Sequence, residues 1–273
     1  MSLKRAIFLT FMGLLPIGCA TDGVKLEQSD CSAVGHEPIV TVQTIEQQQD
    51  VHGTGYRIRR VAELTRAASV QVHNTQRGVR GSGTYFEYNG HHIVVTAAHV
   101  VADGGDIMLI TTPAEESVAA LLLYYDNVVP NDTAVLVLRT PLDSRTPMEL
   151  NLYSKDVNDL IGEQTVYTGD PGHQRNMTIY GTVSSINENG SVMLQSYAWG
   201  GASGSLVFDD RARIIGILKA IDVNRSGVSP YPQINENIVW LSPPSSLNLD
   251  ILDSILVQYG LAMEEALMRG AEQ

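Results

Sequence analysis

Cysteine is scarce in this sequence: Cys19 and Cys31 are its only two cysteines among 273 residues. A Cys19–Cys31 disulfide would tie only the N-terminal part of the chain, so the fold must be stabilised by its hydrophobic core. The two cysteines do not form a Cys-x-x-Cys pair, which argues against a redox or structural zinc role. Apolar residues make up 44% of the chain, which is enough for such a core and argues against a disordered chain.

Positive charge is also scarce, because 18 Lys and Arg residues stand against 30 Asp and Glu residues. The net charge of -12 at pH 7 argues against nucleic acid as a partner, since phosphate binding needs a basic surface. The 7 histidines include no His-Glu-x-x-His motif and no clear pair of ligands four residues apart. We therefore predict no metal site and no cofactor.

The N-terminal apolar run is too short to span a bilayer comfortably. Lys4 and Arg5 precede an apolar stretch over 6–17, which predicts a secretory signal peptide over residues 1–18. Gly18-Cys19 resembles a bacterial lipoprotein site, at which Cys19 would be lipidated, and the alternative is ordinary cleavage after Ala20. We expect an exported protein of bacterial type, either periplasmic and anchored to the membrane by that lipid or secreted.

The rest of the chain is organised as an arm, a series of short strands and a final helix. Residues 19–58 are polar and predict a tether, and a short helix is expected over 59–67. From residue 69 onward, short apolar runs alternate with turn pairs such as Asn89-Gly90, which favours an all-β sandwich or barrel over an α/β hydrolase. A longer helix is expected over 249–268, with Asn248 as its N-cap and an apolar stripe that packs on the core.

A histidine and an aspartate stand at the ends of two apolar strands. His99 follows the run 93–98, whose small residues would let the ring reach a neighbouring cleft. Asp132 precedes the apolar run 134–138, where its carboxylate could accept a hydrogen bond from a histidine Nδ1–H and fix the tautomer. Each residue alone has an ordinary structural explanation, as a strand-end histidine and a turn aspartate.

Ser203 is flanked by glycines ahead of a further strand. Such a tight backbone lets amide N–H groups converge on a developing oxyanion, and the N–H groups of Gly201 and Ser203 are the natural pair. Gly204 directly follows the serine, so the Gly-x-Ser-x-Gly spacing of α/β hydrolases is absent. Taken together, the order His99, Asp132, Ser203 at strand ends predicts a catalytic triad of the chymotrypsin type.

With these motifs, the chain resembles trypsin-like serine peptidases, most closely the bacterial HtrA-like branch, from about residue 69 to residue 221. The motifs that carry the resemblance are Gly81-Ser82-Gly83, Thr96-Ala97-Ala98-His99, Asp132-Thr133-Ala134-Val135-Leu136, Gly169-Asp170-Pro171-Gly172, Gly181-Thr182-Val183-Ser184 and Gly201-Ala202-Ser203-Gly204-Ser205. The resemblance implies an all-β fold of two antiparallel six-stranded barrels with the active site between them. His99 and Asp132 would come from the first barrel and Ser203 from the second.

The resemblance also predicts how the chain divides. We expect the signal peptide over 1–18, the arm over 19–58, the first barrel over 59–147 and the second barrel over 148–247. A C-terminal helix over 248–270 is expected to pack on these barrels. Trimers occur among relatives, but no feature of the sequence indicates an oligomeric state.

Two positions depart from the family pattern. Zymogen-type trypsins have an aspartate just before the serine, whereas this chain has Ala202, so we predict no activation by N-terminal cleavage. Lys219 stands where the family usually has Ser or Thr near the catalytic aspartate. It could pair with Asp132, point into the substrate pocket, or extend its stem into solvent.

The predicted function is that of a serine endopeptidase that acts on proteins or peptides through an acyl-enzyme. The alternative is a trypsin-fold protein with weak or absent catalysis that acts as a binding or structural protein. The predicted substrate pocket is lined by Ser196, Tyr197, Ala198, Lys219, Ala220 and Ile221. Without an obvious acid at its base, this pocket favours small or medium apolar residues over Arg or Lys, or an acidic residue if Lys219 faces it.

Overall fold

The computed structural model describes residues 53–224 and 233–271. The predicted signal peptide, Cys19, Cys31 and the predicted arm up to residue 52 lie outside the described residues. Within the described part, no helix is long and apolar enough to cross a membrane.

Six antiparallel strands close the first barrel, in the order β1-β4-β5-β6-β3-β2, with β1 paired back to β2. Their bounds are β1 (Ser69–Asn74), β2 (Val79–Tyr88), β3 (His91–Thr96), β4 (Ile107–Thr111), β5 (Ser117–Asp126) and β6 (Thr133–Leu138). All six residues of β6 are buried, so both faces of this strand are covered. A short strand, β7 (Met148–Glu149), adds to β2 in parallel, one residue beyond the predicted end of this barrel at 147.

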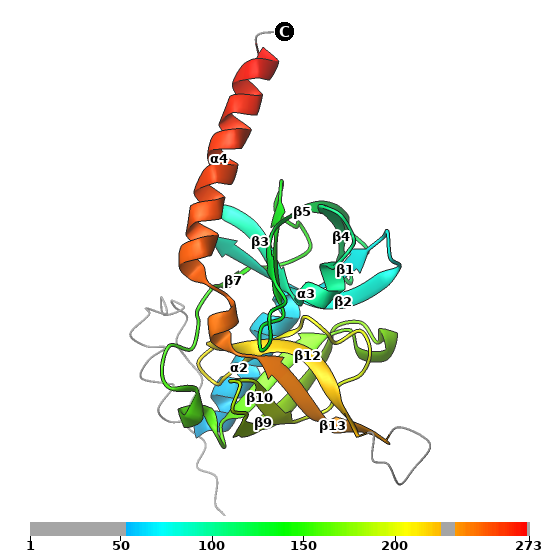
Figure 1. Ribbon diagram of the computed structural model, residues 1–273, viewed down its shortest axis with the longest axis vertical. Coiled ribbons are helices and arrows are strands. Elements are labelled where there is room, and N and C mark those ends of the chain that lie inside the picture. The colour runs from blue at the N-terminus through cyan, green and yellow to red at the C-terminus, as the bar shows by residue number, and fades with distance from the viewer. Residues whose placement is uncertain (1–52, 225–232, 272–273) are drawn as a thin grey trace, which may run out of the picture. The chain divides into compact units, whose positions relative to one another are not determined.

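A second set of six strands closes the other barrel, in the order β10-β13-β12-β11-β8-β9. Their bounds are β8 (Gln164–Gly169), β9 (Met177–Ile186), β10 (Val192–Gln195), β11 (Leu206–Phe208), β12 (Ile214–Asn224) and β13 (Gln233–Ser242). The short helices between strands are α3 (Ala98–Val101), η1 (Val157–Leu160) and η2 (Pro171–His173), and a further one, η3 (Pro244–Ser246), follows β13. The predicted fold class of two antiparallel six-stranded barrels with a C-terminal helix is confirmed (Figure 1).

The two barrels share part of their core. The apolar cluster of the first barrel continues into Val166, Leu206 and Phe208 of the second, all of which are fully buried. Because interiors are close-packed, this shared core fixes the loops of one barrel against those of the other. The candidate site lies among those loops.

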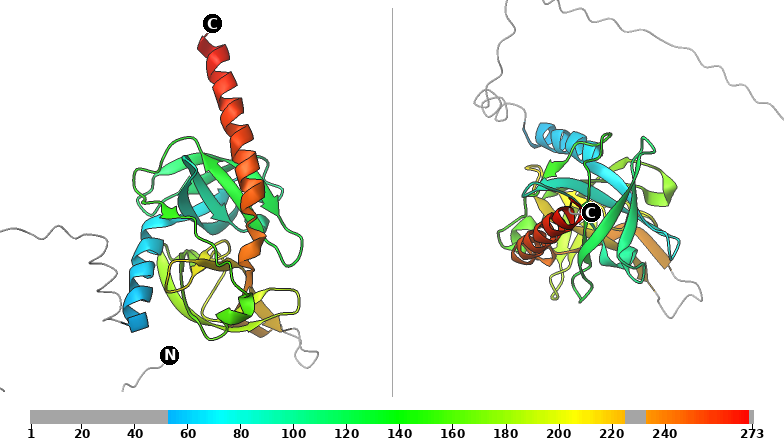
Figure 2. Two further views of the ribbon diagram at one scale, coloured as in Figure 1. Left: turned by 90° about the vertical axis from the view of Figure 1, so that its left-hand side faces the viewer. Right: turned by 90° about the horizontal axis from the view of Figure 1, so that it is seen from above.

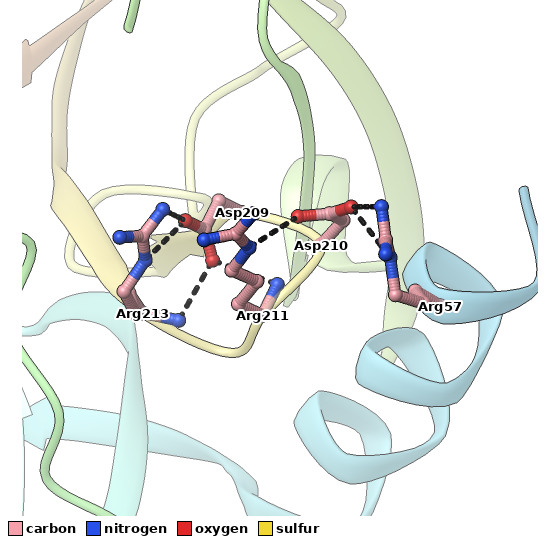
Figure 3. A network of polar contacts seen from close by, with 5 residues as sticks. All are labelled: Arg57, Asp209, Asp210, Arg211 and Arg213. Atoms are coloured by element: carbon pink, nitrogen blue, oxygen red, sulfur yellow. Dashed lines mark hydrogen bonds and ion pairs between the residues drawn. The ribbon is translucent and has the colours of Figure 1, made fainter. Parts of the chain in front are cut away.

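Helix α2 (Gly53–Ala68) lies beside the second barrel (Figure 2). Arg57 forms an ion pair with Asp210 in the β11–β12 turn, with Nε and Nη2 both 2.9 Å from Oδ2 (Figure 3). In the same turn, Arg213 contacts the buried carboxylate of Asp209 at 2.6 Å and lies over the ring of Tyr153. The helix expected over 59–67 therefore begins earlier, at Gly53, because its first turns are held on the barrel.

Helix α4 (Leu249–Ala271) runs along the first barrel and continues beyond it (Figures 1 and 2). The predicted N-cap is confirmed, since Asn248 Oδ1 accepts a hydrogen bond from the N–H of Ile251 at 3.1 Å. Leu252 and Leu256 of the predicted apolar stripe are buried, whereas Val257 on another side of the helix is 64% exposed. The N-terminal half of α4 thus packs on the barrel.

Candidate active site

His99 and Asp132 form a direct pair within the first barrel. His99 lies in helix α3, just after β3, and Asp132 directly precedes β6. The Nδ1 atom of His99 lies 2.6 Å from Oδ2 of Asp132, and the backbone N–H of His99 donates to Oδ1 at 2.9 Å. This carboxylate therefore holds both the ring and the backbone of His99, and it favours the tautomer with the proton on Nδ1 and a free acceptor at Nε2.

The pair is unevenly exposed. The His99 side chain is 45% exposed, whereas that of Asp132 is 14% exposed. The imidazole is therefore open to an incoming molecule while its aspartate is mostly shielded. A bond between partly shielded groups is stronger than the same bond in water.

Ser203 lies next to the helix that carries His99. The carbonyl of Ser203 accepts a hydrogen bond from the N–H of Ser82 in β2 at 2.7 Å. A Cβ on Gly81 would lie 2.8 Å from this carbonyl and 2.5 Å from the side chain of Val100. The serine and helix α3 therefore meet above a glycine, which is the only residue that fits there.

Ser82 in β2 connects the serine loop (199–204) to the β8–β9 turn and to β3. Its hydroxyl donates to the carbonyl of Gly201 at 2.7 Å and accepts from the N–H of Asp170 at 2.9 Å. Its carbonyl accepts a hydrogen bond from Thr96 Oγ1 at the end of β3, at 2.6 Å. Ser82 is fully buried, so each of these bonds satisfies a polar group that water cannot reach.

The backbone of the serine loop leaves the N–H groups of Gly201 and Ser203 without a protein acceptor among the described residues. Gly201 has a φ of +102°, and a Cβ there would lie 2.5 Å from the carbonyl of Asp170. Within the described part of the chain, the N–H groups of Gly201 and Ser203 donate to no protein acceptor, whereas that of Ala202 donates to Trp199. The two residues predicted to form the oxyanion hole thus keep their donors available.

The β8–β9 turn supports the serine loop from the other side. Gly172 N–H donates to the carbonyl of Gly200 at 2.8 Å. The buried carboxylate of Asp170 accepts from Gln71 Nε2 at 3.0 Å and from the N–H of Asn176 at 2.8 Å. Burial raises the pKa of Asp170, while these two bonds and the charge of Arg175 oppose the rise.

Lys219 extends from β12 toward the aspartate loop. Its ammonium donates to the carbonyl of Pro130 at 2.9 Å and to Ser191 Oγ at 2.8 Å. Burial lowers the pKa of Lys219, and the charge of Asp132 opposes this effect. The side chain is therefore not a solvent-directed stem, and its hydrogen bonds go to two neutral groups near Asp132.

The structure places the predicted pocket residues on two sides of β13. Ser196 and Ala198 are buried, and their N–H groups donate to the carbonyls of Asn237 and Glu236 in β13. Tyr197 between them is 37% exposed. On the other side of β13, Ala220 pairs with Trp240 and Ile221 pairs with Val239. Ala220 is exposed and Ile221 is half-buried. Three of the six predicted residues, 196–198, thus precede the serine loop, and the other three, 219–221, lie in β12. Strand β13 runs between the two groups.

A groove adjoins the serine loop along residues 199–201. It has a volume of about 620 Å³ and is lined by β1–β2 residues, by the β8–β9 turn and by Trp199, Gly200 and Gly201. Its lining includes Gln71, Arg80 and Asp170. None of the six predicted pocket residues lines this groove, so the serine loop borders two separate regions.

Ser82, Thr96 and Asp170 are the supporting residues whose roles sequence reasoning missed. All three stand in motifs that the sequence does display, Gly81-Ser82-Gly83, Thr96-Ala97-Ala98-His99 and Gly169-Asp170-Pro171-Gly172. Their supporting role comes from hydrogen bonds to segments that lie far away in the sequence. Among the described residues, no group of three or more His, Cys, Asp or Glu side chains is placed to hold a metal ion.

Two six-stranded antiparallel barrels, with a His–Asp pair on one and a glycine-flanked serine on the other, define the class of trypsin-like peptidases. The trypsin-like peptidase domain family matches residues 81–217, which is half of the chain. The protein therefore belongs to the trypsin-like peptidase domain family, and the predicted resemblance is confirmed.

Solved structures share the fold at low sequence identity. The crystal structure of the serine endoprotease from Yersinia pestis is 18% identical, with a TM-score of 0.54, and the match covers 72% of this chain and 66% of that one. A serine-to-alanine mutant of a protein from M. tuberculosis H37Rv, in its inactive form, is 16% identical, with a TM-score of 0.53, and the match covers 72% of this chain and 90% of that one. No curated protein matches this chain in sequence.

Proposed function

We propose that this protein is a serine endopeptidase that hydrolyses peptide bonds through His99, Asp132 and Ser203. The observation that carries the proposal is the 2.6 Å contact between His99 Nδ1 and Asp132 Oδ2, combined with the placement of Ser203 beside the helix of His99. A histidine oriented in this way can act as a general base toward a serine hydroxyl.

In the proposed reaction, His99 Nε2 takes the proton of Ser203 Oγ as this oxygen attacks the carbonyl carbon of the substrate. The N–H groups of Gly201 and Ser203 stabilise the oxyanion, and Asp132 stabilises the imidazolium. The imidazolium then gives its proton to the leaving amine as the C–N bond breaks. Water, deprotonated by His99, attacks the acyl-enzyme, and the released acid leaves Ser203 Oγ–H restored.

The substrate class follows from the two regions that border the serine loop. We propose that the residue before the cleaved bond occupies the region near Tyr197 and Ala220, and that it is small or medium and apolar. The ammonium of Lys219 already has two protein partners, which favours this choice over an acidic residue. The groove beside Gly201 would bind the residues that follow the cleaved bond, which are released first as the amine product.

The test is a digest of casein by the chain without residues 1–18, compared with its Ser203→Ala variant. We expect cleavage by the wild type and a loss of about six orders of magnitude in turnover for the variant. Mass spectrometry of the products gives the residue on each side of the cleaved bonds. Equal cleavage by both proteins would refute the proposal, and no cleavage by a folded wild type would favour the alternative role as a binding or structural protein.

We further propose that the protein is exported and that lipid on Cys19 anchors it. The proposal rests on the sequence of residues 1–19 alone. Cell fractionation of the wild type and of Cys19→Ser tests it. Wild type in the membrane fraction and variant in the soluble fraction would support a lipid anchor, whereas soluble protein in both cases would support ordinary cleavage and secretion.

A further inference from the structure

An arginine without a protein partner lines the groove beside the serine loop. Arg80, the second residue of β2, is exposed and borders the groove together with Trp199 and Gly201. Within the described part of the chain, its guanidinium forms no hydrogen bond and no ion pair. Arg77, three residues earlier, differs in this respect, because it pairs with Asp103 at 3.0 Å. The groove therefore offers unused cationic donors next to the candidate oxyanion hole.

The acidic residue in the lining of the groove already has its partners. Asp170 is only 5% exposed. Its Oδ2 accepts a hydrogen bond from Gln71 Nε2 at 3.0 Å, and its Oδ1 accepts one from the N–H of Asn176 at 2.8 Å. Burial also raises the pKa of Asp170, which disfavours its charged form. A ligand in the groove therefore meets the open guanidinium of Arg80 rather than an open carboxylate.

A second arginine lies near the same wall of the groove. His73, which pairs with Arg80 across β1 and β2, contacts Gln71 Oε1 through Nε2. Burial lowers the pKa of His73, and the charges of Arg80 and Arg175 lower it further. The charge of Arg175 also acts on Asp170. The positive charge at this wall is therefore carried by guanidinium groups, which bind carboxylates through two parallel hydrogen bonds.

Trp199 gives the groove an aromatic side. Its side chain is 40% exposed, and a Cβ on Gly172 would lie 3.5 Å from its ring. The N–H of Gly172 donates to the carbonyl of Gly200, so the β8–β9 turn is joined to the serine loop here. Gly201, whose N–H is available for an oxyanion, lines the same groove. A peptide whose cleaved carbonyl lies at Gly201 would therefore continue into a groove bounded by Trp199 and Arg80.

We propose that Arg80 is a specificity-determining residue that binds an acidic side chain of the substrate, at one of the first three positions after the cleaved bond. This inference rests on the proposed function of the same site and adds the chemistry that its substrates carry on the leaving side. Because the groove borders Gly201 itself, the residues that enter it are the first ones after the cleaved bond. A carboxylate there accepts hydrogen bonds from the guanidinium, whereas a lysine is repelled by it.

The kinetic test uses peptides that differ only after the cleaved bond. Each carries Glu, Gln or Lys at one of the first three positions and ends in an amide, so that the varied residue supplies the only carboxylate on that side. For the wild type, we expect kcat/KM to be about tenfold higher with Glu than with Gln at the preferred position, and lowest with Lys. Arg80→Gln should remove the preference for Glu, and Arg80→Glu should reverse it in favour of Lys.

Arg77→Gln is the matched control, because it removes the same charge close to the start of β2. Arg77 pairs with Asp103 and does not line the groove. The preference for Glu should therefore stay at about tenfold in this variant. Equal kcat/KM for Glu and Gln at all three positions in the wild type, or an equal loss of the preference in Arg77→Gln, would overturn the inference.

A binding measurement separates this inference from the proposed function. Trp199 and Trp240 are the two tryptophans of the chain, so the fluorescence of Trp199 can be followed alone in a Ser203→Ala/Trp240→Phe protein. Isothermal titration calorimetry of Ser203→Ala makes the same comparison with Trp240 in place. We expect the amidated tripeptide Glu-Glu-Glu to bind about tenfold more tightly than Gln-Gln-Gln. Adding Arg80→Gln should abolish this difference, and adding Arg77→Gln should not.

The two experiments can fail separately. If the wild type proves inactive, the proposed function fails while the titration of the tripeptides still decides the role of Arg80. Equal binding of the two tripeptides, or binding of neither, would overturn the role of Arg80 even in an active peptidase.

Discussion

The two halves of the candidate site are built differently. His99 and Asp132 come from one barrel and bond to each other directly, so the short segments around β3 and β6 are enough to place them. The serine loop is instead held from both barrels, by Gly172 and Leu218 of its own barrel and by Ser82 in β2 of the other. The geometry of the base thus depends on one barrel, whereas the geometry of the nucleophile depends on how both barrels pack. Substitutions on the two sides should therefore fail in different ways.

The largest expected effect is on the base side, where substitution should remove chemistry without loosening the serine loop. His99→Ala should lower kcat by about six orders of magnitude, and Asp132→Asn by about four, because the neutral amide no longer fixes the tautomer. Adding Ser203→Ala to His99→Ala should cost little more, since the residues act as a unit. The measurement is kcat on a peptide identified in the digest. An Asp132→Asn enzyme as fast as the wild type would contradict the assignment.

The next effect tests the contact between the two halves. In Gly81→Ala, the new Cβ would lie 2.5 Å from Val100 and 2.8 Å from the carbonyl of Ser203. Either the serine or helix α3 must move, so we expect a loss of about 1–3 kcal/mol in the free energy of unfolding together with a loss of activity. Urea unfolding and the peptide assay measure the two losses.

Gly55→Ala is the control for that substitution. Gly55 lies in α2, and a Cβ there meets nothing within 4 Å. Alanine favours a helix over glycine by about 1 kcal/mol, so this variant should be as stable as the wild type or more so. A Gly81→Ala enzyme with normal stability and activity would show that the serine and α3 do not meet tightly.

A third substitution tests the support of the serine loop alone. Ser82→Ala leaves the carbonyl of Gly201 and the N–H of Asp170 without their partner, at a cost of about 1–3 kcal/mol. We expect activity to fall by about a hundredfold, because the loop shifts relative to the base. The downfield NMR signal of the His99 Nδ1 proton should persist, since that pair is not touched.

Ser184 offers a control, because its exposed hydroxyl makes only a long bond of 3.4 Å. Ser184→Ala should match the wild type in stability and activity. Loss of the His99 signal in Ser82→Ala would show that the two halves are not as separate as their contacts indicate.

The smallest effect concerns Asp170, whose raised pKa makes stability depend on pH. The folded protein holds this proton more tightly than the unfolded chain does. Wild-type stability should therefore fall as pH rises from the ordinary value of 3.8 through the raised value. Asp170→Asn cannot lose a proton, so its free energy of unfolding should fall less, or rise more, than that of the wild type between about pH 4 and about pH 7. Urea unfolding at both pH values measures this, and an identical change in both proteins would be contrary to the assignment.

The fold and the three main site residues could be predicted from the sequence because their signals are local. Short apolar runs separated by turns predict the strands, and His99, Asp132 and Ser203 each stand at the end of such a run. The resemblance of the motifs then supplied the number of strands and the two-barrel arrangement.

The supporting contacts could not be predicted, because they join distant segments. The Ser82 hydroxyl bonds to Gly201, which is 119 residues away along the chain. The early start of α2 depends on the pairing of Arg57 with Asp210, which is 153 residues away. The direction of Lys219 depends on a β-bulge, and the residue pattern of β12 does not reveal where its register shifts.

The most direct test of the account is to treat the wild type and Ser203→Ala with a fluorophosphonate probe and to map the adduct by mass spectrometry. We expect one adduct on Ser203 of the wild type and none on the variant. An adduct on another residue, or none on a folded wild type, would contradict the claim that His99, Asp132 and Ser203 form a working triad.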